Sequence, residues 1–351
     1  MELSSLKTQV GKWLQGGPEG DIVVSSRVRL ARNIRGYPFV SRASEQQIGG
    51  LEELLRETVL ESGLDRELSY FRLDEMPGLE VEFLMERHLI SRDHAEADWV
   101  RGVAFSAEED VSMMVNEEDH LRMQVMTGGL NLHTAWEEVD RLDDHMASEV
   151  PYAFSPRYGY LTACPTNVGT GMRASAMLHV PALVLRQAMD RVLQVVHENG
   201  LALRGLFGEG TQGAADLYQL SNQVTLGISE EEVIKKVTRV AKEVADMERS
   251  TRETLMEKHE DELQDRIHRA WSLLVEACRL SSEESLHFLS HVRLGVELGL
   301  TPEVTLDKLN GLILLTLPAH LQTMEGREVD SLERNKLRAR YIRERLGPVG
   351  A

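Results

Sequence analysis

The most informative segment of the chain is Cys164-Pro165-Thr166-Asn167-Val168-Gly169-Thr170-Gly171-Met172-Arg173-Ala174-Ser175. It follows a strand-like aromatic run at 158–162, and a helical pattern begins at Leu183. Glycines two residues apart let backbone N–H groups approach a ligand, and an adjacent arginine can hold an anion in its planar fork. A tight loop with a surface arginine would show the same letters. An anion site and a plain loop therefore both stay open here, and three other stretches bear on the choice.

The first of these stretches carries four arginines within nine residues. A strand expected at 21–24 leads into Ser25-Ser26-Arg27-Val28-Arg29-Leu30-Ala31-Arg32-Asn33-Ile34-Arg35-Gly36. Strand alternation places Arg27 and Arg29 on one face and Val28 and Leu30 on the other. The pattern indicates either an exposed edge strand with charged residues or a site for a polyanion.

The second stretch is an acidic cluster at the end of a strand. Paired strands are expected at 103–105 and 111–115, and the latter continues into Asn116-Glu117-Glu118-Asp119-His120-Leu121-Arg122. Such a cluster is commonly a solvated loop. It is also a suitable place for a carboxylate base, because neighbouring charges of both signs set the pKa of a carboxyl group.

The third stretch is Leu201-Ala202-Leu203-Arg204-Gly205-Leu206-Phe207-Gly208-Glu209-Gly210-Thr211-Gln212-Gly213. It is interpreted as a strand with a buried arginine, Arg204, that leads into a glycine-rich loop carrying Glu209. Loops of this composition close on substrates in many enzymes. We therefore expect a mobile flap here.

The remaining pattern predicts a mixed domain followed by helices. Capping boxes predict helix starts at Ser44 and Thr134, and Ser229 is expected to cap a long helix. Further expected elements are strands at 81–85 and 217–226 and helices at 181–200, 251–280, 282–299, 302–317 and 330–346. The expected organisation is a lead-in at 1–20, a catalytic domain at 21–254 and a helical domain at 255–351.

Composition excludes several classes of protein. The chain has 351 residues and a net charge of -18, which argues against general nucleic-acid binding. No apolar run is long enough to span a membrane, and we see no signal peptide. The two cysteines fit a reducing cytoplasm. No lysine occurs between Lys12 and Lys235, so a Walker A motif and the strand lysine of protein kinases are excluded there.

Together these stretches favour phosphoryl transfer to a guanidino nitrogen. A group of arginines can neutralise the charge of a polyphosphate during transfer. Two glutamates on separate loops can clamp a guanidinium group, and one of them can take its proton. The residues concerned are Arg27, Arg29, Arg122, Arg173, Arg204, Glu209 and the glutamates of the acidic cluster.

The chain resembles the phosphagen (guanidino) kinase family over about residues 20–250. The matching motifs are SSRVRLARNIRG from Ser25, NEEDHLR from Asn116, CPTNVGTGMRAS from Cys164 and RG-x-x-GE from Arg204. The resemblance implies an α+β fold, in which an antiparallel sheet is flanked by helices, and a separate all-helical C-terminal domain is added here. It also implies the use of ATP and Mg²⁺, with no metal ligand supplied directly by the protein.

The resemblance further implies a role for each matching position. Glu118 would be the base, Glu209 the second guanidinium clamp, Glu117 a neighbour of the metal's water shell and Cys164 a reactive thiol activated by nearby arginines. His88 would lie near the adenine. The other residues expected in nucleotide-binding loops are Ser25, Ser26, Arg27, Val28, Arg29, Arg122, Arg173, Ala174, Ser175, Ala176, Met177, Arg204, Gly205, Leu206, Phe207 and Gly208.

Three departures from the small-molecule enzymes narrow the resemblance. The first arginine motif begins at Ser25, Phe207 replaces an arginine, and a helical region follows residue 255. In these three features the chain is similar to the bacterial protein-arginine kinases. That similarity implies protein substrates, a role in bacterial stress response and protein degradation, an activator protein, a Clp-type protease and a homo-oligomer.

Two further functional hypotheses, and one question about the C-terminal domain, stay open. A small-molecule phosphagen kinase acting on free arginine is one alternative, and an adaptor protein without catalysis is another. The C-terminal domain of the protein-arginine kinases carries an RDxxRA motif that binds phosphoarginine. Arg334, Asn335 and Arg338 occupy those positions, and Asn335 replaces the aspartate. This segment is consistent with an allosteric site that binds phosphoarginine, and it is equally consistent with a solvated basic helix.

Overall fold

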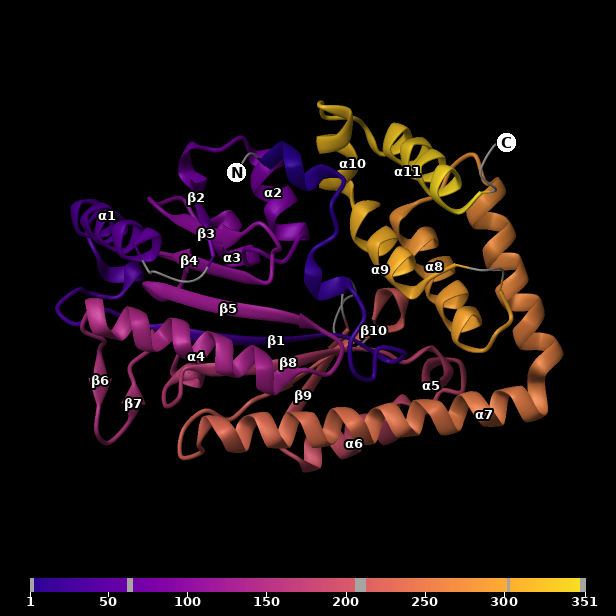
Figure 1. Cartoon of the computed structure of the whole chain (residues 1–351), viewed down its shortest axis with the longest axis horizontal. Helices are drawn as coiled ribbons and strands as arrows, with labels where there is room; N and C mark the ends of the chain where they lie inside the picture. Colours follow the sequence, from indigo (N-terminus) through magenta and orange to yellow (C-terminus); the bar gives the residue numbers. More distant parts are fainter. Residues whose placement is uncertain (1–2, 62–65, 206–212, 302–303, 348–351) are drawn as a thin grey trace.

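The computed structural model describes residues 3–61, 66–205, 213–301 and 304–347. Within these residues the central feature is an eight-stranded antiparallel sheet (Figure 1). Its strands, in spatial order, are β2 (Leu68–Arg72), β3 (Gly102–Ser106), β4 (Val111–Val115), β5 (Leu121–Gly128), β1 (Val23–Arg32), β8 (Met172–His179), β10 (Leu217–Asn222) and β9 (Leu201–Gly205). A small hairpin is formed by β6 (Phe154–Ser155) and β7 (Gly159–Tyr160). The α+β class expected from the sequence is confirmed.

The strand register gives the sheet one strongly basic face. On β1, Arg29 lies opposite Arg173 of β8, and Ala31 lies opposite Arg122 of β5. Directly paired residues point to the same face, and so do alternate residues along a strand. The same reasoning carries across β8 and β10 to Arg204, which lies opposite Gln219. We call this set the arginine face: Arg27, Arg29, Arg122, Arg173 and Arg204.

The opposite face of the sheet forms the main hydrophobic core. It is covered by α4 (Leu132–Glu149), α6 (Met189–Glu198) and the first part of α7 (Glu230–Glu276), which lie along one side of the sheet in Figure 1. α1 (Glu45–Leu60) adds Leu51 and Leu55 to the same core. The buried strand residues that face these helices include Val28, Leu30, Val125, Ala174, Ala176 and Leu220. This core fixes the strands and so holds the arginine face in place.

The predicted strand at 81–85 is wrong. These residues lie in α2 (Gly78–Glu86), which follows the N-cap residue Pro77. Phe83 and Leu84 are buried with Phe105 and Met114 in a second core. A five-residue apolar run fits both periods, and packing over β3 and β4 selects the helix here. A one-turn helix, α3 (Arg92–Glu96), follows.

Two other helix predictions need correction. The helix expected at 181–200 is divided into α5 (Pro181–Leu185) and α6, because Gln187 between them has a left-handed backbone with φ of 54°. The expected capping box at Thr134 is wrong. α4 begins at Leu132 after Asn131, and the Thr134 hydroxyl donates to the Asn131 side chain at 2.9 Å.

The other two predicted helix starts are confirmed. Ser44 and Ser229 accept hydrogen bonds from the N3 backbone of α1 and α7, and both capping boxes are complete.

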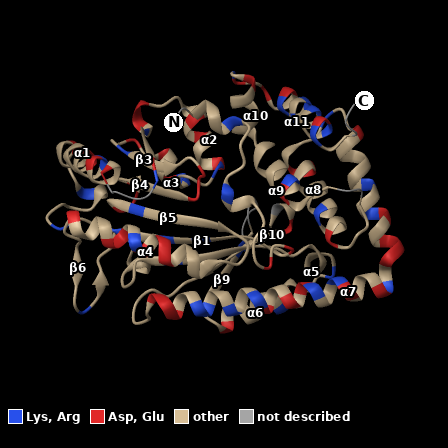
Figure 2. Cartoon of the chain, in the orientation of Figure 1, with Lys and Arg blue, Asp and Glu red and all other residues tan. Residues whose placement is uncertain are grey.

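The C-terminal region is helical beyond a bend in α7. This helix continues across residues 254 and 255 and departs from helical geometry at His259, where φ is -141°. It is followed by α8 (Ser282–Glu297), α9 (Leu306–Leu315), α10 (Pro318–Glu325) and α11 (Ser331–Leu346). Figure 1 shows these four helices gathered beside the distal end of α7, and Figure 2 shows charges of both signs along α7. In the part of the chain that the structure describes, no helix is long and apolar enough to cross a membrane.

Candidate active site

A cavity of about 180 Å³ lies where the arginine face meets the acidic segment. Arg29, Arg122 and Arg173 line it from the sheet. The other side is formed by three carboxylates and a thiol, from Asp93, Glu118, Asp119 and Cys164. The structure thus brings together residues that are more than 100 positions apart in the sequence. Opposite charges facing one another across a small cavity are suited to binding an anion and a cation side by side.

The arginines of this face repel one another. Burial lowers the pKa of Arg29 well below its usual value, and the charges of Arg27, Arg122 and Arg173 lower it further. Burial, Arg122 and Arg173 likewise lower the pKa of Arg27 to about 10. The buried Nε of Arg29 has no hydrogen-bond partner among the described residues. Since a polyphosphate would supply both acceptors and negative charge, the arrangement fits the triphosphate of a nucleotide.

Glu117 orients one member of the arginine face. Its buried carboxylate accepts hydrogen bonds from Arg122, from the Ser91 hydroxyl at 2.5 Å and from the Glu118 backbone N–H at 2.9 Å. Burial alone would raise the pKa of Glu117, but the Arg122 charge and these hydrogen bonds hold that pKa below its usual value. Glu117 therefore stays ionised and fixes the guanidinium group of Arg122.

Glu118 differs from Glu117 in its exposure and in the direction of its pKa shift. Its side chain is exposed and points into the cavity lined by the arginines. Partial burial and the charges of Asp119, Glu117 and Asp93 raise the pKa of Glu118, and Arg122 opposes them. A carboxylate with a raised pKa that is free to reach a ligand is suited to accept a proton.

The acidic segment is anchored at two points. The Asp119 carboxylate accepts hydrogen bonds from the Asn33 side chain at 2.6 Å and from the Ala163 backbone N–H at 2.7 Å. His120 Nδ1 accepts from the Ile34 N–H at 2.9 Å. These bonds join the segment to the end of β1 and to the Cys164 segment. Asp119 and His120 thus hold Glu118 in position.

The glycines of the Cys164 segment serve close packing between parts of the chain. Gly169 and Gly171 have φ of 119° and 63°. A Cβ at Gly169 would lie 2.1 Å from the Thr225 carbonyl oxygen, and one at Gly171 would lie 2.6 Å from that of Ala31. The contacts that require glycine are therefore with neighbouring backbone. Arg173 lies on β8, so its expected placement on a glycine loop is wrong.

Cys164 is half-buried beside this cavity. Its Sγ lies 3.0 Å from the Thr166 hydroxyl oxygen. Burial, Arg204 and Arg122 lower the pKa of Arg173, and the Cys164 thiolate would oppose them. The thiol lines the same cavity as Arg29, Arg122 and Arg173, and its reactivity stays a prediction.

Two arginines of the N-terminal motif lie outside the arginine face. Arg32 is buried on the other side of the sheet, where it donates to Asp143 at 2.5 Å and 2.9 Å and lies 3.5 Å from the ring centroid of Tyr160. Arg35 follows β1 and is exposed. Arg32 is therefore part of the fold, and only Arg27 and Arg29 from this motif belong to the site.

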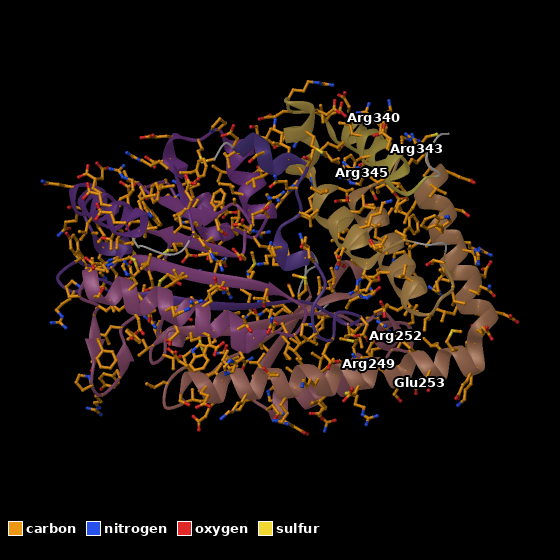
Figure 3. The ribbon with its side chains drawn as sticks, in the orientation of Figure 1. Arg249, Arg252, Glu253, Arg340, Arg343 and Arg345 are labelled. Atoms are coloured by element: carbon orange, nitrogen blue, oxygen red, sulfur yellow. The ribbon has the colours of Figure 1, made fainter. Side chains whose placement is uncertain are left out.

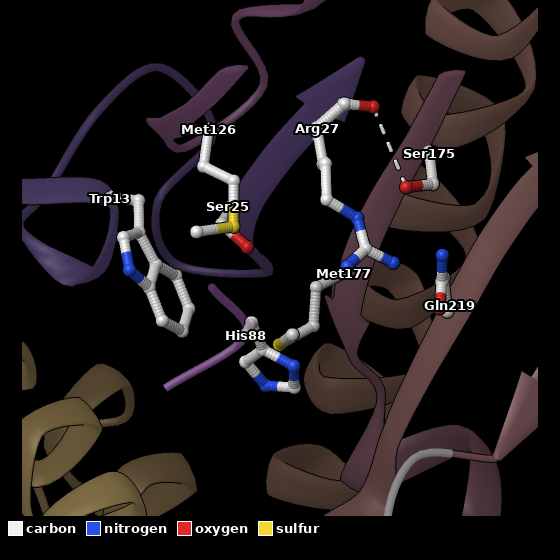
Figure 4. A pocket seen from close by; sticks show the side chains of 8 residues that line it. All are labelled: Trp13, Ser25, Arg27, His88, Met126, Ser175, Met177 and Gln219. Atoms are coloured by element: carbon white, nitrogen blue, oxygen red, sulfur yellow. Dashed lines mark hydrogen bonds between the residues drawn. The ribbon is translucent and has the colours of Figure 1, made fainter. Parts of the chain in front are cut away.

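A second cavity of about 70 Å³ adjoins the first along β1 and β8. Figure 4 shows its lining, which includes Ser25, Arg27, His88, Ser175 and Met177. Burial and the charges of Arg27 and Arg29 lower the pKa of His88 to about 3, so its imidazole is neutral at pH 7. A neutral ring beside apolar Met177 fits a nucleotide base. The stretches around Ser25 and Ser175, expected to be loops, are parts of strands.

Not all of the expected nucleotide-binding residues face these cavities. The side chains of Ser26, Val28, Ala174 and Ala176 are buried on the core side of the sheet. Arg204 is exposed, so the expectation of a buried arginine there is wrong, and Gly205 ends β9. Leu206, Phe207, Gly208 and Glu209 lie outside the described residues.

Sequence reasoning missed several residues that line the cavities, among them Trp13 and Asp93. Trp13 lines the second cavity from the N-terminal segment, and Asp93 lines the first cavity from α3. Neither lies in a motif. Ser91, which caps α3 and also donates to Glu117, ties the start of that helix to the acidic segment and so brings Asp93 to the cavity.

Family models match two adjacent parts of the chain. The ATP:guanido phosphotransferase C-terminal catalytic domain matches residues 51–251, and the C-terminal domain of the protein-arginine kinase McsB matches residues 260–350. The chain belongs to the ATP:guanido phosphotransferase family. The family's name states the use of ATP, in agreement with the arginine face.

Relatives of this guanido phosphotransferase match it over nearly their full length. A protein-arginine kinase from Halothermothrix orenii is 43% identical over 97% of this chain and 99% of the relative. Another protein-arginine kinase, from Symbiobacterium thermophilum, is 44% identical over 95% of this chain and 96% of the relative. The resemblance to the protein-arginine kinase branch of the guanidino kinases is thereby confirmed.

Solved structures of guanidino kinases share the fold. The duplicated taurocyamine kinase of Schistosoma mansoni, solved with transition-state analogue components, matches with a TM-score of 0.61 and 26% identity over 71% of this chain and 37% of that chain. A lombricine kinase structure matches with a TM-score of 0.58 and 26% identity over 70% of both chains.

In this guanido phosphotransferase the positions of the expected phosphoarginine motif lie on α11. Arg338 is buried and donates to the carbonyls of Thr316 and Leu280 and to the Asn335 side chain, at 2.9–3.0 Å. Arg334 donates to the Val329 carbonyl at 2.6 Å. Asn335 thus supports the Arg338 guanidinium with a neutral amide oxygen as the acceptor. α11 also carries the arginines labelled in Figure 3, Arg340, Arg343 and Arg345, of which Arg343 donates to the Ala277 carbonyl at the end of α7.

Proposed function

We propose that this protein transfers the γ-phosphoryl group of ATP to the guanidino group of arginine side chains in proteins. The observation that carries the proposal is the single cavity in which three arginines face three carboxylates. One side suits a polyphosphate and the other suits a guanidinium group. The family and the named relatives support the same reaction.

The arginine face would bind the triphosphate. Arg29, Arg122 and Arg173 line the main cavity, and Arg27 joins it to the cavity beside His88. Charge on the phosphoryl oxygens grows or spreads during transfer, and fixed guanidinium groups stabilise it without reorganisation. Because Glu117 fixes Arg122, this part of the site is organised before the nucleotide binds.

Mg²⁺ would be held mainly by the nucleotide. Among the described residues, no group of three His, Cys, Asp or Glu side chains could hold a metal ion. Phosphate oxygens and water are the ligands that Mg²⁺ commonly uses in kinases. The ion would neutralise phosphate charge, and the residues of this chain would orient the two substrates.

Glu118 would act as the general base. A guanidino nitrogen attacks the γ-phosphorus, a P–N bond forms, and the P–O bond to ADP breaks. The proton released from that nitrogen passes to the Glu118 carboxylate. We propose Glu209 as the second clamp of the guanidinium group, on the basis of the family resemblance. Cys164, which lines the same cavity, would be the reactive thiol that the family resemblance implies.

We also propose the wider setting from the relatives. Protein-arginine kinase is the name of the similar proteins, and the C-terminal helices match the McsB C-terminal domain. We include in the proposal a role in the stress response and in protein degradation, an activator protein, a Clp-type protease, cytoplasmic location and homo-oligomer formation. We also include phosphoarginine binding at α11 and a division into two domains near residue 255.

The experiment is a substrate comparison. The protein is incubated with ATP, Mg²⁺ and an unfolded substrate protein, and in parallel with free arginine or creatine. Products are analysed by mass spectrometry under non-acidic conditions. Phosphoarginine on the unfolded protein supports the proposal. Labelling of the free guanidino compounds alone would instead indicate a small-molecule phosphagen kinase.

A further inference from the structure

Trp13 closes one end of the cavity beside His88. It belongs to a short 3-10 helix at Lys12–Leu14, before the first strand, and only 2% of its surface is exposed. Its ring centroid lies 5.4 Å from that of His88, with an angle of 74° between the planes. Figure 4 shows the six-membered ring of the indole turned toward His88. An edge-to-face contact of this kind fixes the orientation of both rings.

The C-terminal helices hold the segment that carries Trp13. The Asn310 side chain of α9 donates to the Leu14 carbonyl at 3.3 Å, and the Gly16 N–H donates to the Asp307 carboxylate at 2.9 Å. On the other side, the Lys12 N–H donates to the Glu108 carbonyl at 3.0 Å. The segment is therefore fastened between the catalytic sheet and α9.

The C-terminal region lies behind the indole. A small cavity of about 20 Å³ separates Trp13 and His88 from Ile313 and Leu314 of α9. Trp13 and Leu14 share one hydrophobic core with α8, α9 and α11. A displacement of α9 would therefore reach the indole directly, since closely packed side chains transmit such shifts.

Stability alone does not account for a tryptophan at this position. The indole N–H is buried and has no hydrogen-bond partner among the described residues. An unpaired buried donor is destabilising, and a phenylalanine would avoid it. The wide ring instead provides the surface that lines the cavity.

We propose that Trp13 is a positioning residue for the nucleotide base. It holds the His88 ring and forms the apolar end of the base cavity, and α9 completes the site from behind. The inference rests on the nucleotide site proposed above. It assigns to the N-terminal segment a direct part in ATP binding and to the C-terminal helices a supporting part through that segment.

The first test uses tryptophan fluorescence in the full-length protein. Trp13→Phe is compared with Trp136→Phe, because Trp136 lies on α4, on the core side of the sheet, and its N–H donates to Glu230 at 3.1 Å. We expect ADP to change the emission of the wild type and of Trp136→Phe, and to leave that of Trp13→Phe unchanged. A full ADP response in Trp13→Phe would overturn the inference.

The second test uses kinetics. We expect Trp13→Ala to raise the KM for ATP about five- to tenfold, to change kcat less than about twofold and to reduce the preference for ATP over UTP. Asp307→Ala should raise the same KM, and Lys308→Ala, its exposed neighbour, should not. Unchanged KM and base preference in both Trp13 variants would refute the role. The wild type's own formation of phosphoarginine tests the proposed function separately.

Discussion

Arg29 on β1 lies directly opposite Arg173 on β8. Like charges at paired positions of a sheet destabilise it. Among the described residues, neither arginine forms an ion pair with a carboxylate, and burial with the neighbouring arginines lowers the pKa of both. The nucleotide-free site therefore holds unfavourable charge that a polyphosphate would relieve.

This repulsion predicts opposite effects on stability and on activity for one substitution. Arg29→Met should raise the free energy of unfolding by about 1 kcal/mol, because it removes a buried, unpaired charge. It should lower kcat/KM for ATP by about 100-fold, because a phosphate contact is lost. Urea denaturation and steady-state kinetics measure the two effects. Arg35→Met, at an exposed position after β1, should change neither. A less stable Arg29→Met protein would contradict this view of the site.

The arginine face could be predicted from the sequence only in part. Alternation correctly placed Arg27 and Arg29 on one face, because β1 pairs regularly with both neighbouring strands from Ser25 to Leu30. The partners of that strand could not be predicted, because β5 and β8 come from segments about 100 and 150 residues away. Arg32 belongs to the same sequence motif but not to the site, because it pairs with Asp143 on α4, and this partner is distant in the sequence.

The pH dependence of the reaction should respond to Asp93. A general base works in its ionised form, so activity is lost as pH falls through its pKa. Asp93 contributes to the raised pKa of Glu118, together with partial burial, Asp119 and Glu117. Asp93→Asn should therefore lower that pKa and move the acid limb of the kcat/KM profile to lower pH.

The matched control for this variant lies on the same short helix. Glu96→Gln makes the same change of charge at an exposed position of α3 that does not line the cavity. Its pH profile should match the wild type. An unshifted acid limb in Asp93→Asn, with the fold intact by circular dichroism, would remove Asp93 from the site.

The buried pair of Arg32 and Asp143 should dominate local stability. Removing one partner of a buried ion pair leaves the other charge poorly compensated, and the remaining carboxylate near Arg32, that of Glu230, lies at 3.8 Å. We expect Asp143→Ala to lower the free energy of unfolding by about 3–5 kcal/mol. Asp144→Ala, at the next and exposed position, should change it by less than about 0.5 kcal/mol. Urea midpoints followed by circular dichroism compare the two, and equal midpoints would show that the pair contributes little.

The site residues Trp13 and Asp93 could not be predicted from the sequence, for the same physical reason. Trp13 and Asp93 act from segments without a motif, and only packing brings them to the cavities. The run at 81–85 was mistaken for a strand because its apolar residues fit either period. Because of that error, the position of His88 in the turn after α2, where its φ is 60°, could not be predicted.

Substitutions can distinguish the role of Glu117 in supporting Arg122 from the role of Glu118 as the base. Glu117→Gln should weaken the support of Arg122 and raise the KM for ATP, because the carboxylate that fixes this guanidinium is lost. Glu118→Gln should leave that support in place. A pair of variants in adjacent residues thus distinguishes nucleotide binding from proton transfer.

The most direct test of the account is phosphoryl transfer by Glu118→Gln under conditions where ATP binding is measured in parallel. Calorimetry should give an affinity for ATP within about threefold of the wild type, while the rate of phosphoarginine formation on an unfolded substrate protein falls by about 100- to 10,000-fold. A rate equal to that of the wild type would contradict the assignment of Glu118 as the base in this cavity.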